Sequence, residues 1–174
     1  MFRGDFAKYS NHFAPIADFL NNEIDTVVGV EVPCVNHEKQ VAGTCDLIAL
    51  NKRGELACYD FKTQFIKTLK NGEKAPVVYD DWASQLDNYA NAHPILFDDN
   101  FDLYRSLLKD CPKPKIYNVV LDVSEPSKPH LHEWKENDPL LKKGREKFDL
   151  LHQLFKLNHN FDLDPALVQG GLEM

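Results

Sequence analysis

Apolar side chains recur every three or four positions in three segments of the chain, which predicts three amphipathic helices. The first spans about residues 5–22, with Asp5 as its cap. The second is capped by Asp80 or Asp81 and reaches about residue 93. The third begins at Asp138-Pro139, because proline favours the first position of a helix.

Shorter segments, in which apolar residues alternate with polar ones or run together, are typical of strands. We predict strands over residues 27–34, 41–50, 55–63, 116–123 and 130–134. Lys52-Arg53-Gly54 joins the second and third as a three-residue loop, since such loops place glycine third. Residues 64–79 show weak periodicity and are predicted to form a flexible loop. The order of helix, three strands, helix, two strands and helix predicts an α/β fold with a mixed β-sheet flanked by helices.

The composition suits one globular domain, because 43% of the 174 residues are hydrophobic and 27% are charged. We assign residues 1–158 to this domain and residues 159–174 to a C-terminal tail. No apolar run of about 20 residues occurs, so no membrane partner is expected. The N-terminus lacks the apolar stretch of a signal peptide, and the four cysteines form no CxxC motif. These features predict reduced thiols in a cytoplasmic protein.

A net charge of −7 excludes a generally basic surface for nucleic acid, but it is compatible with a local basic patch beside an acidic metal centre. The notable basic cluster consists of Lys67, Lys70 and Lys74, after the third predicted strand. A charge run is usually a solvated surface. In a chain that is otherwise acidic, this cluster predicts contacts with phosphates.

The hairpin loop determines which residues face each other across the second and third predicted strands. If residues 52–54 form the loop, Asn51 lies opposite Glu55, and Asp46 then lies opposite Asp60. Their Cβ atoms would be about 5 Å apart on one face of the sheet. Lys62 points the same way, because it is two residues beyond Asp60. A four-residue loop would instead separate the two carboxylates.

The predicted carboxylate pair needs a counter-charge. Two carboxylates facing each other repel, and their apolar neighbours make burial of both charges costlier. A divalent cation with oxygen ligands resolves this conflict, and the Lys62 ammonium is then placed to orient or deprotonate a metal-bound water. The alternative is a surface hairpin that carries ordinary charges.

These residues carry a resemblance to a known family. Asp46 and Asp60-Phe61-Lys62 resemble the D…(D/E)-x-K core of the PD-(D/E)XK nuclease superfamily. Gly43-Thr-Cys-Asp46 is similar to the G-x-x-D strand of that superfamily. Gln85-Leu-Asp-Asn-Tyr89 is similar to the Q-x-x-x-Y motif of its RecB-type branch.

Two further segments extend the resemblance. His12 resembles the N-terminal histidine of the branch, although Ala7 and Lys8 stand where the glycine of its GxxxH pattern would fall. Glu31-Val-Pro resembles its E-x-P strand. The similarity covers the chain from His12 to Trp134, and the layout resembles the group of the mitochondrial genome maintenance exonuclease and its phage and bacterial relatives.

The resemblance implies a restriction-endonuclease-like core with a metal site. In this site the carboxylates of Asp46 and Asp60 and the backbone carbonyl of Phe61 would bind the metal. Lys62 would position the water nucleophile. His12 would be a further metal ligand, and its alternative is a packed or surface histidine.

Three more residues have roles implied by the same resemblance. Gln85 and Tyr89 would lie at the edge of the site, where they hold the DNA backbone or brace the catalytic strands. Their spacing of four residues puts them on one helix face. Glu31 would support the metal ligands, or it is simply solvated.

We therefore expect a Mg²⁺-dependent deoxyribonuclease, with Mn²⁺ as a substitute, that acts as an exonuclease on DNA single strands or free ends. The cysteine cluster of the iron–sulfur exonucleases in this branch is absent, so no such cluster is expected. Three alternatives stay open. They are a structure- or site-specific endonuclease of the same fold, a non-catalytic nucleic-acid-binding or assembly module that kept the fold, and a metal-binding protein unrelated to nucleic acid.

Overall fold

The structure, a computed structural model, describes residues 6–159, apart from the side chains of residues 6–10, 12, 98 and 159. The predicted cap Asp5 and the predicted tail beyond residue 159 lie outside the described residues. In chain order, the elements are α1 (Phe6–Glu23), β1 (Ile24–Asn36), β2 (Val41–Asn51), β3 (Leu56–Gln64), α2 (Asp80–Ala90), β4 (His93–Pro94), α3 (Asp98–Asp110), β5 (Lys115–Asp122), β6 (His130–Glu133) and α4 (Pro139–His159).

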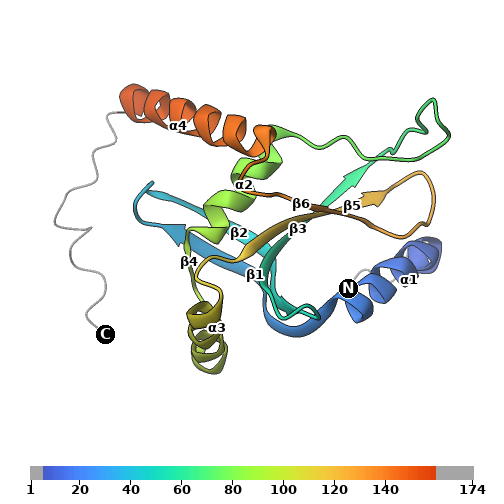
Figure 1. The fold of residues 1–174 in the computed structure, drawn as a ribbon, viewed down its shortest axis with the longest axis horizontal. Helices are drawn as coiled ribbons and strands as arrows, with labels where there is room; N and C mark the ends of the chain where they lie inside the picture. The colour runs from blue at the N-terminus through green and yellow to red at the C-terminus, as the bar shows by residue number, and fades with distance from the viewer. Residues whose placement is uncertain (1–5, 160–174) are drawn as a thin grey trace.

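A mixed sheet of six strands, in the order β4-β1-β2-β3-β5-β6, runs through the described residues. Strand β3 pairs in parallel with β5, whereas the other neighbouring strands are antiparallel. Helices α2, α3 and α4 contribute to the core on one face, and α1 packs on the other (Figure 1). The predicted α/β class with a mixed sheet flanked by helices is therefore confirmed. None of the described helices combines the length and apolar character needed to span a bilayer.

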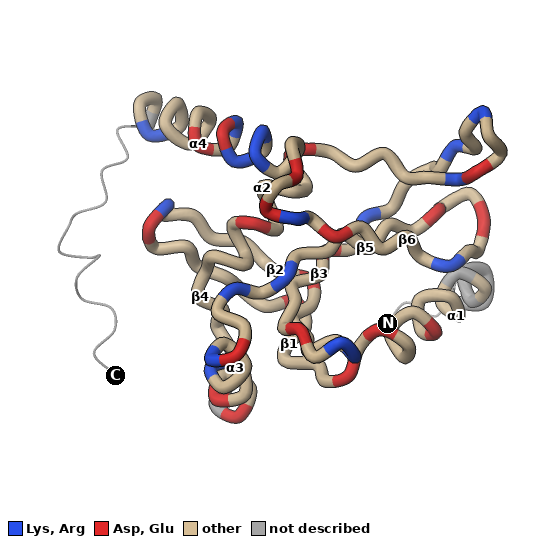
Figure 2. The backbone as a smooth tube through the Cα atoms, in the orientation of Figure 1, with Lys and Arg blue, Asp and Glu red and all other residues tan. Residues whose placement is uncertain are grey.

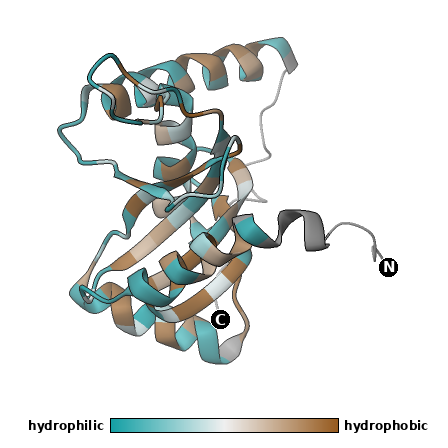
Figure 3. Ribbon diagram, turned by 90° about the vertical axis from the view of Figure 1, so that its right-hand side faces the viewer, coloured by the Kyte–Doolittle hydropathy of each residue, from teal (hydrophilic) through white to brown (hydrophobic). Residues whose placement is uncertain are grey.

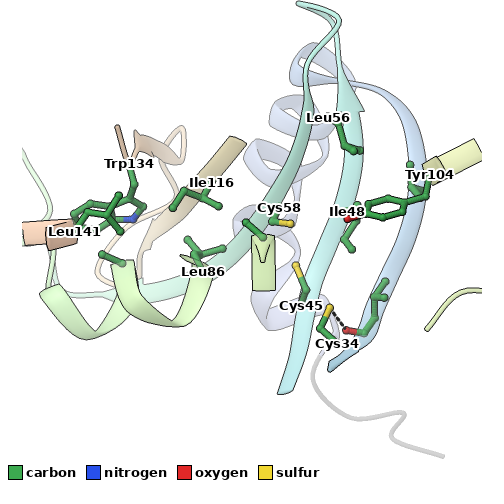
Figure 4. Packing of buried hydrophobic residues seen from close by; sticks show 14 residues of the cluster. Cys34, Cys45, Ile48, Leu56, Cys58, Leu86, Tyr104, Ile116, Trp134 and Leu141 are labelled. Carbon is green, nitrogen blue, oxygen red and sulfur yellow. Dashed lines mark hydrogen bonds between the residues drawn. The ribbon is translucent and has the colours of Figure 1, made fainter. Parts of the chain in front are cut away.

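Side chains of the central strands alternate between two hydrophobic clusters, one on each face of the sheet. Ile48 and Cys58 belong to the cluster beneath α2, and Leu47 and Tyr59 belong to the cluster that α1 covers. Figure 4 shows Leu86 of α2 among the strand residues of the first cluster. Hydrophobic residues accordingly concentrate along the strands in Figure 3.

The three cysteines of β1, β2 and β3 are buried free thiols in this core. They are Cys34, Cys45 and Cys58, which lie close together in Figure 4. Burial raises the pKa of the Cys34 thiol to about 12. The three buried thiols pack as small apolar groups, as the sequence predicts.

The predicted hairpin register is confirmed. Strands β2 and β3 pair from Leu50↔Leu56 to Leu47↔Tyr59, which is the register that a loop at residues 52–54 requires. The amide of Gly54 donates a hydrogen bond of 2.9 Å to the carbonyl of Asn51. Gly54 has a φ of 78°, a left-handed conformation that glycine adopts at little cost.

Two elements between α2 and β5, namely β4 and α3, are missing from the sequence-based prediction, and the helix predicted to reach residue 93 ends at Ala90. Helix α3 lacks a start signal, because its N-cap, Phe97, forms no side-chain cap hydrogen bond. Hydrophobic packing fixes the position of α3 instead, since its residue Tyr104 is buried in the hydrophobic cluster beneath α2.

The start of α2 also differs from the prediction. Asp80 and Asp81 are the first helical residues, and the N-cap is Tyr79, so the expected capping role of the two aspartates is wrong. The carboxylate of Asp80 instead forms ion pairs with Lys143 and Lys147 of α4. The negative charges still lie in the first turn, where the helix dipole favours them.

Helices α2 and α4 cross at close range. A Cβ atom at Gly144 would collide with the backbone carbonyl of Asp80. Next to this crossing, the buried Asp87 accepts two hydrogen bonds from Arg145, at 2.6 and 2.9 Å. Burial acts to raise the pKa of Asp87, but hydrogen bonds from Arg145 and Lys113 outweigh it and hold the pKa below its ordinary value. The pair therefore joins the two helices as ions.

The replacement Gly144→Ala tests the close crossing. Helix propensity alone would stabilise the protein by about 1 kcal/mol. The collision with Asp80 should reverse this sign and destabilise folding by about 1–3 kcal/mol. Chemical denaturation measures the change, and Lys142→Ala, at an exposed position of the same helix, is the matched control. A Gly144→Ala protein as stable as the parent would show that α4 does not approach α2 so closely.

Candidate active site

The candidate site lies where β2 and β3 part. Their antiparallel pairing ends at Leu47↔Tyr59, whereas β3 stays paired with β5 as far as Gln64↔Asp122. Beyond Tyr59, β3 therefore keeps its ladder on one side only within the described strands. The N–H and C=O groups of β3 that face β2 therefore need other hydrogen-bond partners. Side chains can occupy the space where β2 no longer pairs with β3.

Asp60 is the first residue of β3 beyond this point, and it is only 2% exposed. The Nζ atom of Lys62 lies 2.8 Å from its Oδ2 atom. The amide of Asn118 donates a hydrogen bond of 2.7 Å to the same oxygen. Burial raises the pKa of Asp60, and the charge of Asp46 adds to this effect, while Lys62 acts in the opposite direction. The carboxylate is thus a buried charge that its partners compensate in part.

Asp46 reaches the site through the backbone of the neighbouring strand. Its Oδ2 atom accepts a hydrogen bond of 2.7 Å from the backbone N–H of Phe61. The register predicts a direct pair of Asp46 with Asp60, but the pairing of β2 with β3 stops one residue short of it. Asp46 is also among the residues that line a pocket of about 380 Å³ on the side of α1, with Leu47 and Phe61. The two carboxylates are close enough for Asp46 to influence the pKa of Asp60.

A chain of hydrogen bonds connects β3 to α2. The ammonium of Lys62 donates to Oε1 of Gln85 at 2.9 Å, and Nε2 of Gln85 donates to the hydroxyl of Tyr89, also at 2.9 Å. Gly43 of β2 packs against the ring of Tyr89, where an added Cβ atom would lie 2.7 Å from Cε1. The structure thus brings Asp60, Lys62, Gln85 and Tyr89 into one connected group.

Glu31 lies next to Asp46 across the sheet. Val30 pairs with Leu47 and Val32 pairs with Cys45, so the residues between them, Glu31 on β1 and Asp46 on β2, lie opposite each other. Glu31 is exposed and has a φ of 51°, a left-handed conformation that costs an ordinary residue roughly 1–3 kcal/mol. The regular alternation predicted for this strand fails here, because Val30 is 65% exposed while Val32 is buried.

Two residues of the site were not anticipated from the sequence. The indole N–H of Trp134 donates a hydrogen bond of 2.7 Å to Oδ1 of Asn118. This bond turns the NH₂ group of Asn118 toward Asp60, and both Asn118 and Trp134 are buried. An asparagine within the apolar run of β5 is the available signal, because a buried amide needs partners. Its partners, however, depend on long-range packing.

The three lysines after β3 differ in their surroundings. Lys67 and Lys70 are exposed and have no ion pair within the described residues. Lys74 instead pairs with Asp122, the last residue of β5, and with Glu125 of the segment that follows β5. Two of the three lysines that the sequence predicts to contact phosphates thus have no ion pair within the described residues, and the phosphate contacts stay a prediction. These charges are visible in the extended segment between β3 and α2 in Figure 2.

The donor set suits a hard divalent cation that retains water ligands. No three His, Cys, Asp or Glu side chains gather as a metal site within the described part of the chain. Asp46 and Asp60 supply two carboxylates, and Mg²⁺ commonly uses one or two carboxylates and keeps several waters. The side chain of His12, the third predicted ligand, lies outside the described residues.

Comparisons with known proteins do not assign the chain to a group. No protein-family model matches it, and no curated protein matches it either.

Replacement of Asp60 by asparagine tests the cost of its buried charge. A carboxyl group whose pKa is raised by folding adds stability below the ordinary pKa of about 3.9, and this stability is lost as the pH rises through the raised value. At pH 7, metal-free Asp60→Asn should therefore be as stable as the parent, or more stable by about 0.2–1 kcal/mol. The difference should vanish as the pH falls below the ordinary value.

Melting curves at pH 7 and at acidic pH measure this difference, with Asp102→Asn on the exposed side of α3 as the control. A large loss of stability in metal-free Asp60→Asn would identify Asp60 as a structural partner of Lys62 and Asn118.

Proposed function

We propose that this protein is a metal-dependent DNA nuclease of the PD-(D/E)XK superfamily, in its RecB-type branch, with a restriction-endonuclease-like core. One observation carries the proposal. The buried Asp60 is hydrogen-bonded to Lys62, and Gln85 connects Lys62 to Tyr89. Asp46 accepts a hydrogen bond from the backbone N–H of Phe61, the residue between Asp60 and Lys62. These positions match the motif residues of that branch. A surface hairpin with ordinary charges would not bury Asp60 to 2% exposure.

In the proposed reaction, the oxygen of a water molecule bonds to the phosphorus of a phosphodiester and the P–O bond to the 3′ oxygen breaks. Net transfer of one proton from the water to that oxygen leaves a 5′-phosphate and a 3′-hydroxyl. Asp46, Asp60 and the backbone carbonyl of Phe61 would hold a Mg²⁺ ion, which when bound would stabilise the negative charge that develops on the phosphate. Lys62 orients the attacking water through its ammonium group. Gln85 holds that ammonium in place, since its Oε1 accepts a hydrogen bond of 2.9 Å from Lys62. Tyr89 fixes Gln85 in turn.

We favour an exonuclease on single strands or free ends, because the Gln85 to Tyr89 spacing matches the motif of that branch. An endonuclease of the same fold is the second candidate. Circular single-stranded DNA separates the two, since only an endonuclease can cut a strand without ends. A non-catalytic module would cleave neither linear nor circular DNA.

Digestion of end-labelled linear DNA with and without Mg²⁺ tests the proposed activity. The parent should cleave only with metal, and Asp46→Asn and Asp60→Asn should lose activity by orders of magnitude, because each removes a charged metal ligand. Metal at 100 times its dissociation constant should stabilise the parent by roughly 2.7 kcal/mol, and this shift should disappear in Asp60→Asn. The control Asp102→Asn should keep both properties. An Asp60→Asn protein that keeps its metal shift and its activity would show that the site is assigned wrongly.

Trp134 should act on the reaction through Asn118. In Trp134→Phe the amide of Asn118 loses the donor that orients it, so kcat should fall by roughly fivefold to tenfold while KM for DNA stays unchanged. Asn118→Leu should lower kcat further, and the double variant should be no slower than Asn118→Leu alone. Additive effects in this double-mutant cycle would show that Trp134 does not act through Asn118.

A further inference from the structure

The segment between β3 and α2, residues 65–79, is an ordered projection that we call the arm (Figure 1). Thr68 and Lys74 form a β-bridge across it. Between them, the amide of Gly72 donates a hydrogen bond of 2.9 Å to the carbonyl of Leu69, in a turn where Gly72 has a φ of 85°. The flexible loop predicted for this segment is therefore a small hairpin with its own hydrogen bonds.

The base of the arm is attached to the sheet. The side chain of Gln64, at the end of β3, donates to the carbonyl of Val77 at 3.0 Å and accepts from its amide at 2.8 Å. Ile66 is buried at 5% exposure. Lys74 pairs with Asp122, whose side chain is 1% exposed. These contacts hold the arm beside the carboxyl end of β3, which carries the candidate catalytic residues.

The attached arm presents an unusual mixture of side chains to solvent. Phe65 is 74% exposed and Leu69 is 48% exposed. Lys67 and Lys70 alternate with them and are exposed as well. Because Phe65 is three residues from Lys62 along nearly extended backbone, their Cα atoms lie about 10 Å apart. An exposed aromatic ring among cations, one or two nucleotide lengths from a phosphodiesterase site, fits a chain of alternating bases and phosphates.

We propose that the arm binds single-stranded nucleic acid as it enters the site, with Phe65 stacked on an unpaired base and with Lys67 and Lys70 in contact with phosphates. This inference rests on the proposed nuclease function and names the part of the fold that would bind its single-stranded substrate. Stacking on a side chain requires a base whose face is free, which single strands offer and an intact duplex does not. The lysines supply a local electrostatic attraction in a protein whose net charge is −7.

The test measures binding of a labelled single-stranded oligonucleotide and of its duplex, without metal and over a range of salt concentrations. Phe65→Ala should weaken single-strand binding roughly tenfold, with an unchanged slope of log K against log salt and little effect on the duplex. Lys67→Ala/Lys70→Ala should flatten the single-strand slope by about 1.4, since each phosphate contact contributes about 0.7. Phe97→Ala, at a residue that is 90% exposed outside the arm, is the matched control and should bind like the parent.

Two further variants separate stacking from general apolar contact. Phe65→Trp keeps an aromatic face and should bind like the parent, whereas Phe65→Leu should be as weak as Phe65→Ala. Equal binding by Phe65→Leu and the parent would overturn the stacking role. Equal losses on single strands and duplex would overturn the substrate class and indicate a general binding surface.

The outcomes also separate this inference from the proposed function. A parent protein that cleaves DNA with Mg²⁺ while Phe65→Ala binds single strands unchanged would leave the nuclease function standing and overturn the role of the arm. A parent that neither binds nor cleaves DNA would overturn both. If Phe65→Ala weakens the binding of another protein but leaves nucleic-acid binding unchanged, the arm is a protein-contact surface and the proposal is overturned.

Discussion

The site depends on one constraint, which is that β2 leaves β3 while β3 continues along β5. The separation frees the backbone N–H of Phe61 from its strand partner, and the carboxylate of Asp46 supplies the acceptor that this N–H requires. It also leaves Asp60 inside the protein without a neighbouring strand on that side. A carboxylate in such a place is costly unless cations and amide groups surround it, and Lys62 and Asn118 meet this need from β3 itself and from β5.

The polar groups around Asp60 form a continuous path across several elements. From Trp134 the path passes through Asn118, Asp60 and Lys62, and it ends at Gln85 and Tyr89 of α2. Each member restricts its neighbour to one orientation, because amide and indole groups have distinct donor and acceptor sides. Burial outweighs the hydrogen bonds from Lys62 and Asn118 and holds the pKa of Asp60 above its ordinary value. A bound cation would relieve the same charge that destabilises the metal-free protein, so one feature links folding, metal affinity and the proposed chemistry.

The sequence predicts the parts of the site that depend on short-range geometry. The hairpin register follows from a glycine third in its loop, and the contact between Gln85 and Tyr89 follows from helical spacing. Long-range contacts are not encoded in such local patterns. The partners of Asn118 require the parallel crossover to β5, and Lys74 meets Asp122 across 48 residues of chain. Val30 is exposed although the alternation of apolar and polar residues predicts that it is buried, because the left-handed backbone at Glu31 interrupts the strand.

The ion pairs of Lys74 also bear on how an acidic protein could attract a polyanion. Asp122 and Glu125 lie beside the arm, and their negative charges alone would repel phosphates. Lys74 offsets part of this charge, and the exposed ammonium groups of Lys67 and Lys70, together with the exposed carboxylate of Glu73, then contribute to the local potential of the arm. Replacing Lys74 would therefore remove one of the contacts that hold the arm and would leave the charges of Asp122 and Glu125 without this cation. The lysine that is least available for a phosphate contact thus supports the two that are available.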